Sequence, residues 1–356
     1  MKNSIRSILS NSVRSRWSST MAQAPAISPF SQAVVNTMRK LYPESLADKT
    51  FDNTGLLLES PYTPNHNLKN TVLLTTDLTK AVADEAIARR DSIIITYHPI
   101  IFRGLKSLTL QDTQQTSLLR LAQEGISVYS PHTAVDAVPG GMADWLCDIV
   151  SGKFANTAPT AIERTGGGSY SAVIYPQPTP NQQTSTSVDA HTRVPIRPSP
   201  EPVPTGFEGA GAGRLLTFST PQPLSTLLDR IGAATGCPGS ISLAIPQGRN
   251  VSSIQIRTVG VCPGSGSSIL MNPPSGVLPD LLFTGELSHH EALAAVERGS
   301  AVVTVFHSNS ERGYLWDVMR RKLEDGIVTQ LGIQEQGEVV AVSKVDRDPF
   351  GVVVRK

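Results

Sequence analysis

Ser92-Ile-Ile-Ile-Thr-Tyr-His98 decides the fold class, because it is an uninterrupted apolar run that ends in a histidine. Two further runs have the same form, Gly125-Ile-Ser-Val-Tyr-Ser-Pro-His132 and Ser300-Ala-Val-Val-Thr-Val-Phe-His307. Apolar runs without polar alternation are typical of strands that are buried on both faces of a parallel sheet. Ligands of such sheets bind outside the carboxyl ends of the strands, which is where each histidine falls.

Segments with helical periodicity separate the strand-like runs. Helices are predicted over residues 29–42, 80–90, 111–124, 142–150, 223–232, 288–298 and 311–323, and strands over residues 71–76, 92–96, 126–130, 213–218, 240–245, 254–261, 280–284, 301–306, 339–342 and 352–354. Residues 51–59 are predicted to form a turn that leads into a strand. This alternation predicts an α/β fold with mostly parallel sheets that carry helices on both faces.

The bulk composition excludes several classes of protein. The chain has 356 residues, enough for two domains, and its formal net charge of +1 gives no sign of a nucleic-acid surface. No window approaches the roughly 20 apolar residues of a membrane span, so no membrane association is expected. Cys147, Cys237 and Cys262 are far apart and form no CxxC pair, so we expect structural thiols rather than disulfides or a thiolate zinc site.

The N-terminal segment differs in composition from the rest. Residues 1–43 contain no acidic side chain, whereas several Lys and Arg lie among many Ser and Thr. This composition is typical of a mitochondrial transit peptide, and the alternative is a basic disordered tail. A second start at Met21 would give a cytoplasmic form. Residues 1–27 are excluded from the predicted fold in either case.

A proline-rich stretch interrupts the middle of the chain. Residues 176–205 combine eight prolines with Gln, Ser and Thr and almost no large apolar side chain. Such a segment cannot bury enough apolar surface to offset the loss of chain entropy, so it is interpreted as a disordered insert. A proline-rich docking motif is the weaker alternative.

Two of the histidines are followed by a carboxylate four residues later. These pairs are His132 with Asp136 and His307 with Glu311. On a helical turn the two side chains share a face, so a nitrogen and an oxygen ligand can reach one ion or bridge two. Either pair alone would be interpreted as a surface contact, but two pairs at strand ends favour a metal site. Zn, Fe, Mn and Ni all suit such ligands.

Two other motifs resemble functional sites at first sight. Ser288 and Glu291 have the spacing of a capping box, so His289 and His290 are interpreted as the start of a helix, with Glu286 as a candidate lining residue. The Gly-rich stretches 209–213 and 261–268 match neither GxGxxG nor a P-loop. The second is compatible with a backbone anion nest, but a plain turn is favoured.

Five motifs together resemble the Nif-three-like family (Ngg-interacting factor three), which is also described as GTP cyclohydrolase I type 2-like. The resemblance covers residues 29–355 apart from the proline-rich insert. The motifs are Asp52-Asn-Thr-Gly-Leu-Leu-Leu58, Tyr97-His-Pro-Ile-Ile-Phe102, His132-Thr-Ala-Val-Asp-Ala-Val-Pro-Gly-Gly-Met-Ala-Asp-Trp-Leu146, Thr284-Gly-Glu-Leu-Ser-His-His-Glu-Ala-Leu293 and His307-Ser-Asn-Ser-Glu-Arg312.

The resemblance implies two intertwined three-layer α/β domains. A metal-binding domain is expected from residues 28–150 plus 280–356, with a middle domain from residues 151–279. The resemblance further implies two divalent metal ions and a ring-like homo-oligomer, commonly a hexamer. It also implies a small-molecule substrate and, from the family's name, a transcription regulator as a candidate partner.

The family's metal ligands correspond to His98, Asp136, His307 and Glu311. Bacterial members have a histidine at the position of Tyr97, so one metal position lacks an imidazole here. Glu311 and His132 are the residues expected to take part in catalysis, with His132 as a reserve ligand or a partner of one. The resemblance implies a metal-dependent hydrolase that acts on a nucleotide-like substrate. The alternative is a non-catalytic, metal-containing interaction protein.

Overall fold

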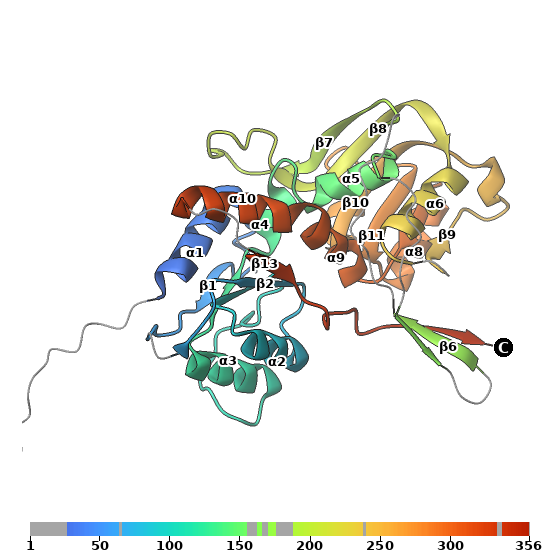
Figure 1. The fold of residues 1–356 in the computed structure, drawn as a ribbon. Coiled ribbons are helices and arrows are strands. Elements are labelled where there is room, and N and C mark those ends of the chain that lie inside the picture. The colour runs from blue at the N-terminus through green and yellow to red at the C-terminus, as the bar shows by residue number, and fades with distance from the viewer. Residues whose placement is uncertain are drawn as a thin grey trace, which may run out of the picture.

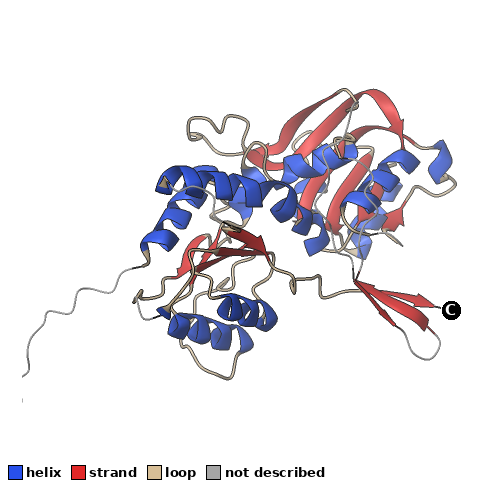
Figure 2. Cartoon of the chain, viewed as in Figure 1, coloured by secondary structure: helices blue, strands red, loops and turns tan. Residues whose placement is uncertain are grey.

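The computed structural model describes residues 27–63, 66–154, 162–165, 170–175, 188–237, 240–332 and 337–355. Within these ranges the chain forms mixed sheets flanked by helices, which confirms the predicted α/β class. Figures 1 and 2 show two sheet-and-helix bodies side by side, with a smaller arm that carries the C-terminal strand.

In the described part of the chain, the first sheet has five strands in the order β1-β4-β3-β2-β13. Their bounds are β1 (Gly55–Leu58), β2 (Val72–Thr75), β3 (Ile93–Thr96), β4 (Ser127–Ser130) and β13 (Val340–Val342). The strands β4, β3, β2 and β13 are parallel, and only β1 at the edge is antiparallel to its neighbour. The central strands are buried throughout, as the continuous apolar runs predict.

Helices cover both faces of the first sheet. Leu73 and Ile94 face α2 (Lys80–Arg89) and α3 (Thr113–Glu124), whereas Leu74 and Ile95 face the opposite side. That opposite side packs against α1 (Pro29–Leu41) and α10 (Arg320–Leu331). Alternate residues of a strand point to opposite faces, so each apolar run supplies two cores. Burial of each Leu or Ile side chain stabilises the folded state by roughly 1.5–3 kcal/mol relative to an exposed side chain.

The helix starts follow the local sequence. Ser28, Thr79 and Asp112 each accept a hydrogen bond from a first-turn backbone N–H and so cap α1, α2 and α3. Helix α3 ends at Gly125, whose φ of 78° is a conformation that glycine adopts without strain. Short elements complete this body: η1 (Glu44–Leu46) and α4 (Thr133–Ala137).

The second sheet has six strands, within the described ranges, in the order β7-β8-β10-β11-β12-β9. They are β7 (His191–Pro198), β8 (Gly211–Pro223), β9 (Ser242–Ala244), β10 (Gln255–Ser265), β11 (Leu281–Glu286) and β12 (Ala301–Thr304). The neighbours β10, β11 and β12 are parallel, and the outer pairings are antiparallel. This sheet is therefore more mixed than the first.

Helices also sandwich the second sheet. One face packs against α5 (Met142–Val150) and α6 (Leu224–Ala234), and the other against α7 (Ser267–Leu270) and α8 (His289–Glu297). Among the short elements, η3 (Val251–Ser253) precedes β10, whereas η4 (Ser308–Ser310) and α9 (Arg312–Tyr314) follow β12. A π-helical turn, η5 (Leu315–Met319), then joins α9 to α10, so one helical stretch leads from the second sheet onto the first.

A third sheet forms the arm seen in Figure 1. Its described strands are β5 (Ile162–Thr165), β6 (Tyr170–Tyr175) and β14 (Val352–Arg355), in the order β14-β6-β5. All pairings are antiparallel, so the C-terminal strand closes onto the segment that follows α5.

The strand pairing corrects two expectations from the sequence. The division at residue 280 assigned β11 and β12 to the first body, but both strands pair within the second sheet, whereas α10 and β13 pack and pair with elements of the first. The proline-rich segment was expected to be disordered, but β7 occupies residues 191–198 of it. Two of its prolines fit there because β7 is an edge strand, where a missing N–H is tolerated. Residues 176–187 lie outside the described ranges, as do residues 1–26.

In the described residues, none of the helices is both long and apolar enough to span a membrane.

Candidate metal centre

The candidate site lies where the two main sheets meet. Asp77 and His98 follow the carboxyl ends of β2 and β3 in the first sheet. Glu286 ends β11 and His307 follows β12 in the second sheet. Parallel neighbours end at the same edge, so each sheet presents its polar residues at one edge. The connection through η4 and α9 supplies Glu311, which is fully buried.

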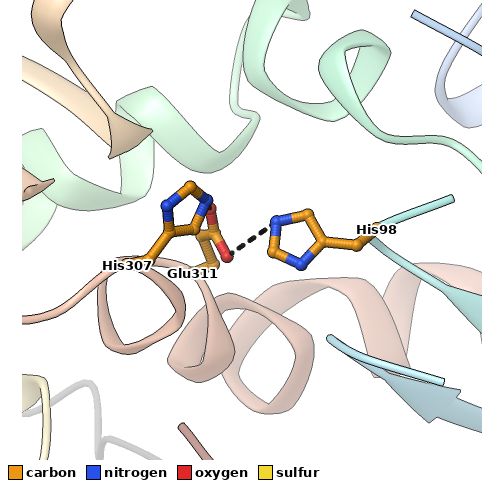
Figure 3. Close-up of side chains that lie close together, drawn as sticks. All are labelled: His98, His307 and Glu311. Atoms are coloured by element: carbon orange, nitrogen blue, oxygen red, sulfur yellow. Dashed lines mark ion pairs between the residues drawn. The ribbon is translucent and has the colours of Figure 1, made fainter. Parts of the chain in front are cut away.

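Three of the predicted ligands converge on one point. The Nε2 atom of His98 lies 3.4 Å from Oε2 of Glu311, and the Nε2 atom of His307 lies 3.4 Å from Oε1. One ligand atom from each residue falls within 4.8 Å of the others. Figure 3 shows the two imidazoles on either side of the carboxylate.

The buried Glu311 carboxylate fits a bound cation. Among the described residues, no donor makes a hydrogen bond to either of its oxygens, although both are buried. Buried charges in proteins are normally paired or bound to a metal, because an unpaired one is costly. Ligand atoms about 2.1 Å from a tetrahedral ion lie roughly 3.4 Å apart, which matches the separation of Glu311 from each imidazole nitrogen.

A second carboxylate orients each imidazole. Nδ1 of His98 lies 2.9 Å from Oδ1 of Asp77, and Nδ1 of His307 lies 2.8 Å from Oε1 of Glu286. Carboxylates in this position fix the tautomer so that Nε2 faces the metal side. Burial alone would raise the pKa of Asp77, but the hydrogen bond and charge of His98 outweigh it and lower that pKa.

Asp136, the fourth predicted ligand, lies outside this group of three. Its two oxygens accept hydrogen bonds from the Tyr97 hydroxyl at 2.9 and 3.0 Å. Burial, together with the charge of Glu311, raises the pKa of Asp136 to about 7 despite the opposing charge of His132. The Tyr97 hydroxyl therefore holds the Asp136 carboxylate. Bacterial relatives are expected to have a histidine, and so an imidazole, at the sequence position of Tyr97.

His132 faces the cluster but does not join it. Its ring centre is 5.6 Å from that of His98 and 5.4 Å from that of Tyr97. Nδ1 of His132 lies 2.6 Å from Oδ1 of Asp52, whose carboxylate also accepts from Thr133. The backbone of His132 has a φ of 33°, an unfavourable value for a residue with a Cβ. Such strain is maintained only where the surroundings fix the residue.

The Gly-rich segment 261–268 borders the site. A Cβ on Gly264 would lie 2.6 Å from Oε1 of Glu311 and 2.8 Å from Nε2 of His307. The backbone N–H of Gly264 donates to Oγ of Ser310 at 2.8 Å. Glycine is thus required here so that the backbone can approach the cluster closely. The two interpretations drawn from the sequence, an anion nest and a plain turn, did not include this role.

Other sequence candidates lie away from the cluster. Ser288 and Glu291 form the predicted capping box, and His289 and His290 are exposed in the first turn of α8. All three cysteines are free and buried, and burial raises the pKa of Cys147 to about 12, as expected for structural thiols.

Two residues of the site, Asp77 and Asp52, are not among those predicted from the sequence. Asp77 directly follows the strand run 71–76, so the rule that selected the histidines would have found it. Asp52 lies inside a quoted motif, but nothing in its local spacing links it to His132.

A cavity of about 1030 Å³ adjoins the cluster, and His98 and His307 form part of its lining. The site therefore has room for a molecule beside the candidate ligands.

Comparison with known proteins assigns a family. Residues 31–349 match the family model Duf34/NIF3 (NGG1p interacting factor 3). The chain is 40% identical over 322 residues to the Protein NIF3 homolog of Schizosaccharomyces pombe, a match that covers 90% of this chain and 97% of that protein. It is 35% identical over 326 residues to NGG1-interacting factor 3 of Saccharomyces cerevisiae, covering 90% and 96%.

Solved structures share the fold at lower identity. The Bacillus cereus protein related to NIF3 aligns with a TM-score of 0.62 and 18% identity over 90% of this chain and 98% of that one. Reduced HcgD from Methanocaldococcus jannaschii aligns with a TM-score of 0.55 and 16% identity over 87% and 96%. These likenesses concern the fold, whereas the family model and the two yeast relatives show that the chain belongs to the Duf34/NIF3 (NGG1p interacting factor 3) family.

Proposed function

We propose that the chain is a divalent-metal-dependent hydrolase that acts on a nucleotide-like substrate. The single observation that supports this most strongly is the buried Glu311 carboxylate, which has no hydrogen-bond donor among the described residues and faces two imidazole nitrogens. A buried charge of this kind is expected to be matched by a cation. The adjoining cavity supports a small molecule as the substrate.

The proposed ligands are His98, Asp136, His307 and Glu311. Together they would hold two divalent ions, as the family resemblance implies, with the Glu311 carboxylate close to the imidazoles of both His98 and His307. When bound, a divalent ion acts as a Lewis acid that polarises a substrate oxygen and lowers the pKa of water. The ion could be Zn, Fe, Mn or Ni, all of which accept such ligands.

Other side chains of the site orient ligands or move protons. Asp77 and Glu286 hold the imidazoles of His98 and His307 with Nε2 toward Glu311. Asp52 holds Nδ1 of His132, which leaves Nε2 of His132 to accept or donate a proton on the side of the cluster. We assign His132 the role of general acid or base, and Asp52 that of its positioning residue.

The test is hydrolysis of a nucleotide panel, including GTP, by metal-reconstituted protein. We expect His307→Ala and Glu311→Ala to lose turnover by at least about 100-fold while the circular dichroism spectrum is retained. His289→Ala is a matched control, because His289 is exposed and lies outside the cluster. Equal activity of His307→Ala and His289→Ala would refute the proposal.

A second candidate is a non-catalytic interaction protein. The name of the yeast relative, NGG1-interacting factor 3, supports it, with a transcription regulator as the partner. A coordination shell filled entirely by protein atoms, measured by X-ray absorption on the metal-loaded protein, would favour this candidate. A shell with exchangeable water would favour the hydrolase.

We also propose that the chain assembles into a homo-oligomeric ring, as the family resemblance suggests. Large apolar side chains are exposed in the segment after β3, with Phe102 45%, Leu108 53% and Leu110 75% exposed. A second copy would bury them. Light scattering should show an oligomer, with the hexamer as the expected size. The double variant Leu108→Ser/Leu110→Ser should shift the protein toward smaller species. Val277→Ser, at a position that is 73% exposed elsewhere, should not do so.

For localisation, we propose mitochondrial import through residues 1–27 and a cytoplasmic form that starts at Met21. The basic, acid-free composition of this segment supports the proposal. Fluorescent fusions with and without residues 1–20 would test it.

A further inference from the structure

The cavity beside the metal cluster extends well beyond the candidate ligands and has room for a whole small molecule. Its volume of about 1030 Å³ is comparable to that of pockets that bind whole small molecules, roughly 300–1,000 Å³. The lining includes the start of α2, the residues after β3 and the residues after β13. The cavity thus extends from His98 and His307 along the carboxyl edge of the first sheet.

In the described part of the chain, three cationic side chains line this cavity: Lys80, Lys344 and Arg347. Lys80 makes an exposed ion pair with Asp84 at 2.8 Å, a contact that is worth little in water. Within the described ranges, no carboxylate pairs with the side chain of Lys344 or Arg347. The Arg347 guanidinium lies 4.3 Å from the ring centre of Tyr175, and such stacking keeps the planar group extended.

The carboxylates of the lining are already engaged. Asp77 holds His98 at 2.9 Å. Asp348 accepts hydrogen bonds from the backbone N–H of Ser308 at 3.1 Å and from its hydroxyl at 2.7 Å. The charges of the lining that lack a counterion are therefore positive, and they face a space that adjoins a candidate metal centre. This combination selects for an anion.

We propose that Lys344 and Arg347 bind the anionic end of a small molecule whose reacting part lies at the metal cluster. The ligand class is a small molecule with a phosphate or carboxylate group. The inference rests on the proposed function, because it assigns the charged group of the substrate to a position beside the site of reaction. Lys344 acts as a point charge and Arg347 as a planar donor pair, which together suit a multiply charged group.

The first test is calorimetric binding of inorganic pyrophosphate to protein stripped of metal and dialysed. We expect Lys344→Met and Arg347→Met each to weaken binding at least about tenfold, since each removes one charge-assisted contact. Lys40→Met is the matched control, because Lys40 is exposed at the end of α1 and does not line the cavity. Citrate in place of pyrophosphate distinguishes carboxylate from phosphate ligands.

The outcomes separate this inference from the proposed hydrolase. Pyrophosphate and citrate binding that is absent, or that neither Met variant weakens, overturns the inference. Turnover of a nucleotide with unchanged KM in both variants overturns it too, while the hydrolase proposal stands. Binding that depends on Lys344 and Arg347 in a protein that hydrolyses nothing supports the inference and refutes the hydrolase.

Discussion

Glu311 is the residue on which the site depends. It lies fully buried between His98, which follows β3 of the first sheet, and His307, which follows β12 of the second. No donor among the described residues makes a hydrogen bond to its oxygens. A structural carboxylate would be expected to accept hydrogen bonds, as Asp348 does: its Oδ1 accepts from the backbone N–H of Phe350 at 2.9 Å and its Oδ2 from the hydroxyl of Ser308 at 2.7 Å. The contrast between these buried carboxylates is what separates a ligand from a structural residue.

Gly264 should be essential for the site but not for the fold. In Gly264→Ala, the added methyl group would overlap Glu311 and His307, and the φ of 60° adds backbone strain. We expect metal affinity to fall at least about tenfold while the protein stays folded. Titration of metal against a chromophoric chelator measures this.

Gly206→Ala provides the control for strain alone. Gly206 has a φ of 89°, and nothing lies within 4 Å of the added Cβ. It should lose stability through backbone strain, by no more than Gly264→Ala does, but keep its metal affinity. Equal metal affinity in the two variants would show that the close approach of Gly264 has no role in binding.

At the scale of elements, an ion pair and hydrogen bonds join the segment after β13, which contains Asp346, to the segment after β12, which contains Arg312. Arg312 forms a buried ion pair with Asp346 and also donates to Oγ of Ser308 at 2.6 Å. Asp346 in turn accepts from the backbone N–H of Thr76 at 2.7 Å, at the end of β2. These contacts tie β2 and β13 of the first sheet to the turn that carries Glu311.

Asp346→Asn should therefore disturb both stability and metal binding. Removing one partner of a buried ion pair leaves the other charge unpaired, so we expect a loss of about 3–5 kcal/mol in the free energy of unfolding. Denaturant titration measures it. Metal affinity should fall roughly 10–100-fold, because Arg312 is adjacent to Glu311 in the chain.

Asp229→Asn is the matched control for the loss of a carboxylate. Asp229 is exposed on α6, so its unfolding free energy should change by less than about 0.5 kcal/mol. If Asp346→Asn behaves in the same way, the ion pair with Arg312 does not connect the two sheets energetically.

Local elements and strand-end residues could be predicted because their signals are local. The runs before His98, His132 and His307 are strands with polar residues at their carboxyl ends, as expected. Helix α4 was anticipated only as the helical turn that places His132 and Asp136 on one face, because five residues carry too little periodicity to predict a helix. The proline-rich composition likewise concealed β7, since an edge strand tolerates prolines that a central strand would exclude.

At the scale of the whole molecule, sheet membership could not be predicted from the sequence. The strands β3 (Ile-Ile-Ile-Thr) and β12 (Ala-Val-Val-Thr) are both apolar runs that end in Thr, yet they belong to different sheets. Which strands pair depends on contacts between distant segments, and a one-dimensional pattern does not contain them. For the same reason the contacts of His98 with Asp77 and of His132 with Asp52 could not be predicted from the sequence, because the partners lie far apart along the chain.

The stability of the metal-free protein should fall as pH rises from 5.5 to 8.5. Burial raises the pKa of Asp136 to about 7. Burial alone would lower the pKa of His98, but Glu311 and Asp77 raise it well above the usual value. Both groups therefore bind protons more tightly when folded, and this stabilisation is lost as pH rises through the folded pKa values. Thermal melting after dialysis against chelator measures the effect.

Two comparisons check the origin of this pH dependence. Asp136→Asn removes one of the two groups and should flatten the lower part of the curve. Added metal should reverse the trend, since protons compete with metal for the same ligands. A metal-free melting temperature that rises between pH 5.5 and 8.5 would contradict the assignment.

The metal content of the purified protein tests the central claim most directly. Inductively coupled plasma mass spectrometry should find at least one divalent ion per chain in the wild-type protein and in His289→Ala. Glu311→Gln, which preserves the shape of the side chain and removes its charge, should lose nearly all of that metal while remaining folded. A wild-type protein without metal, or a Glu311→Gln variant with undiminished metal, would contradict the account.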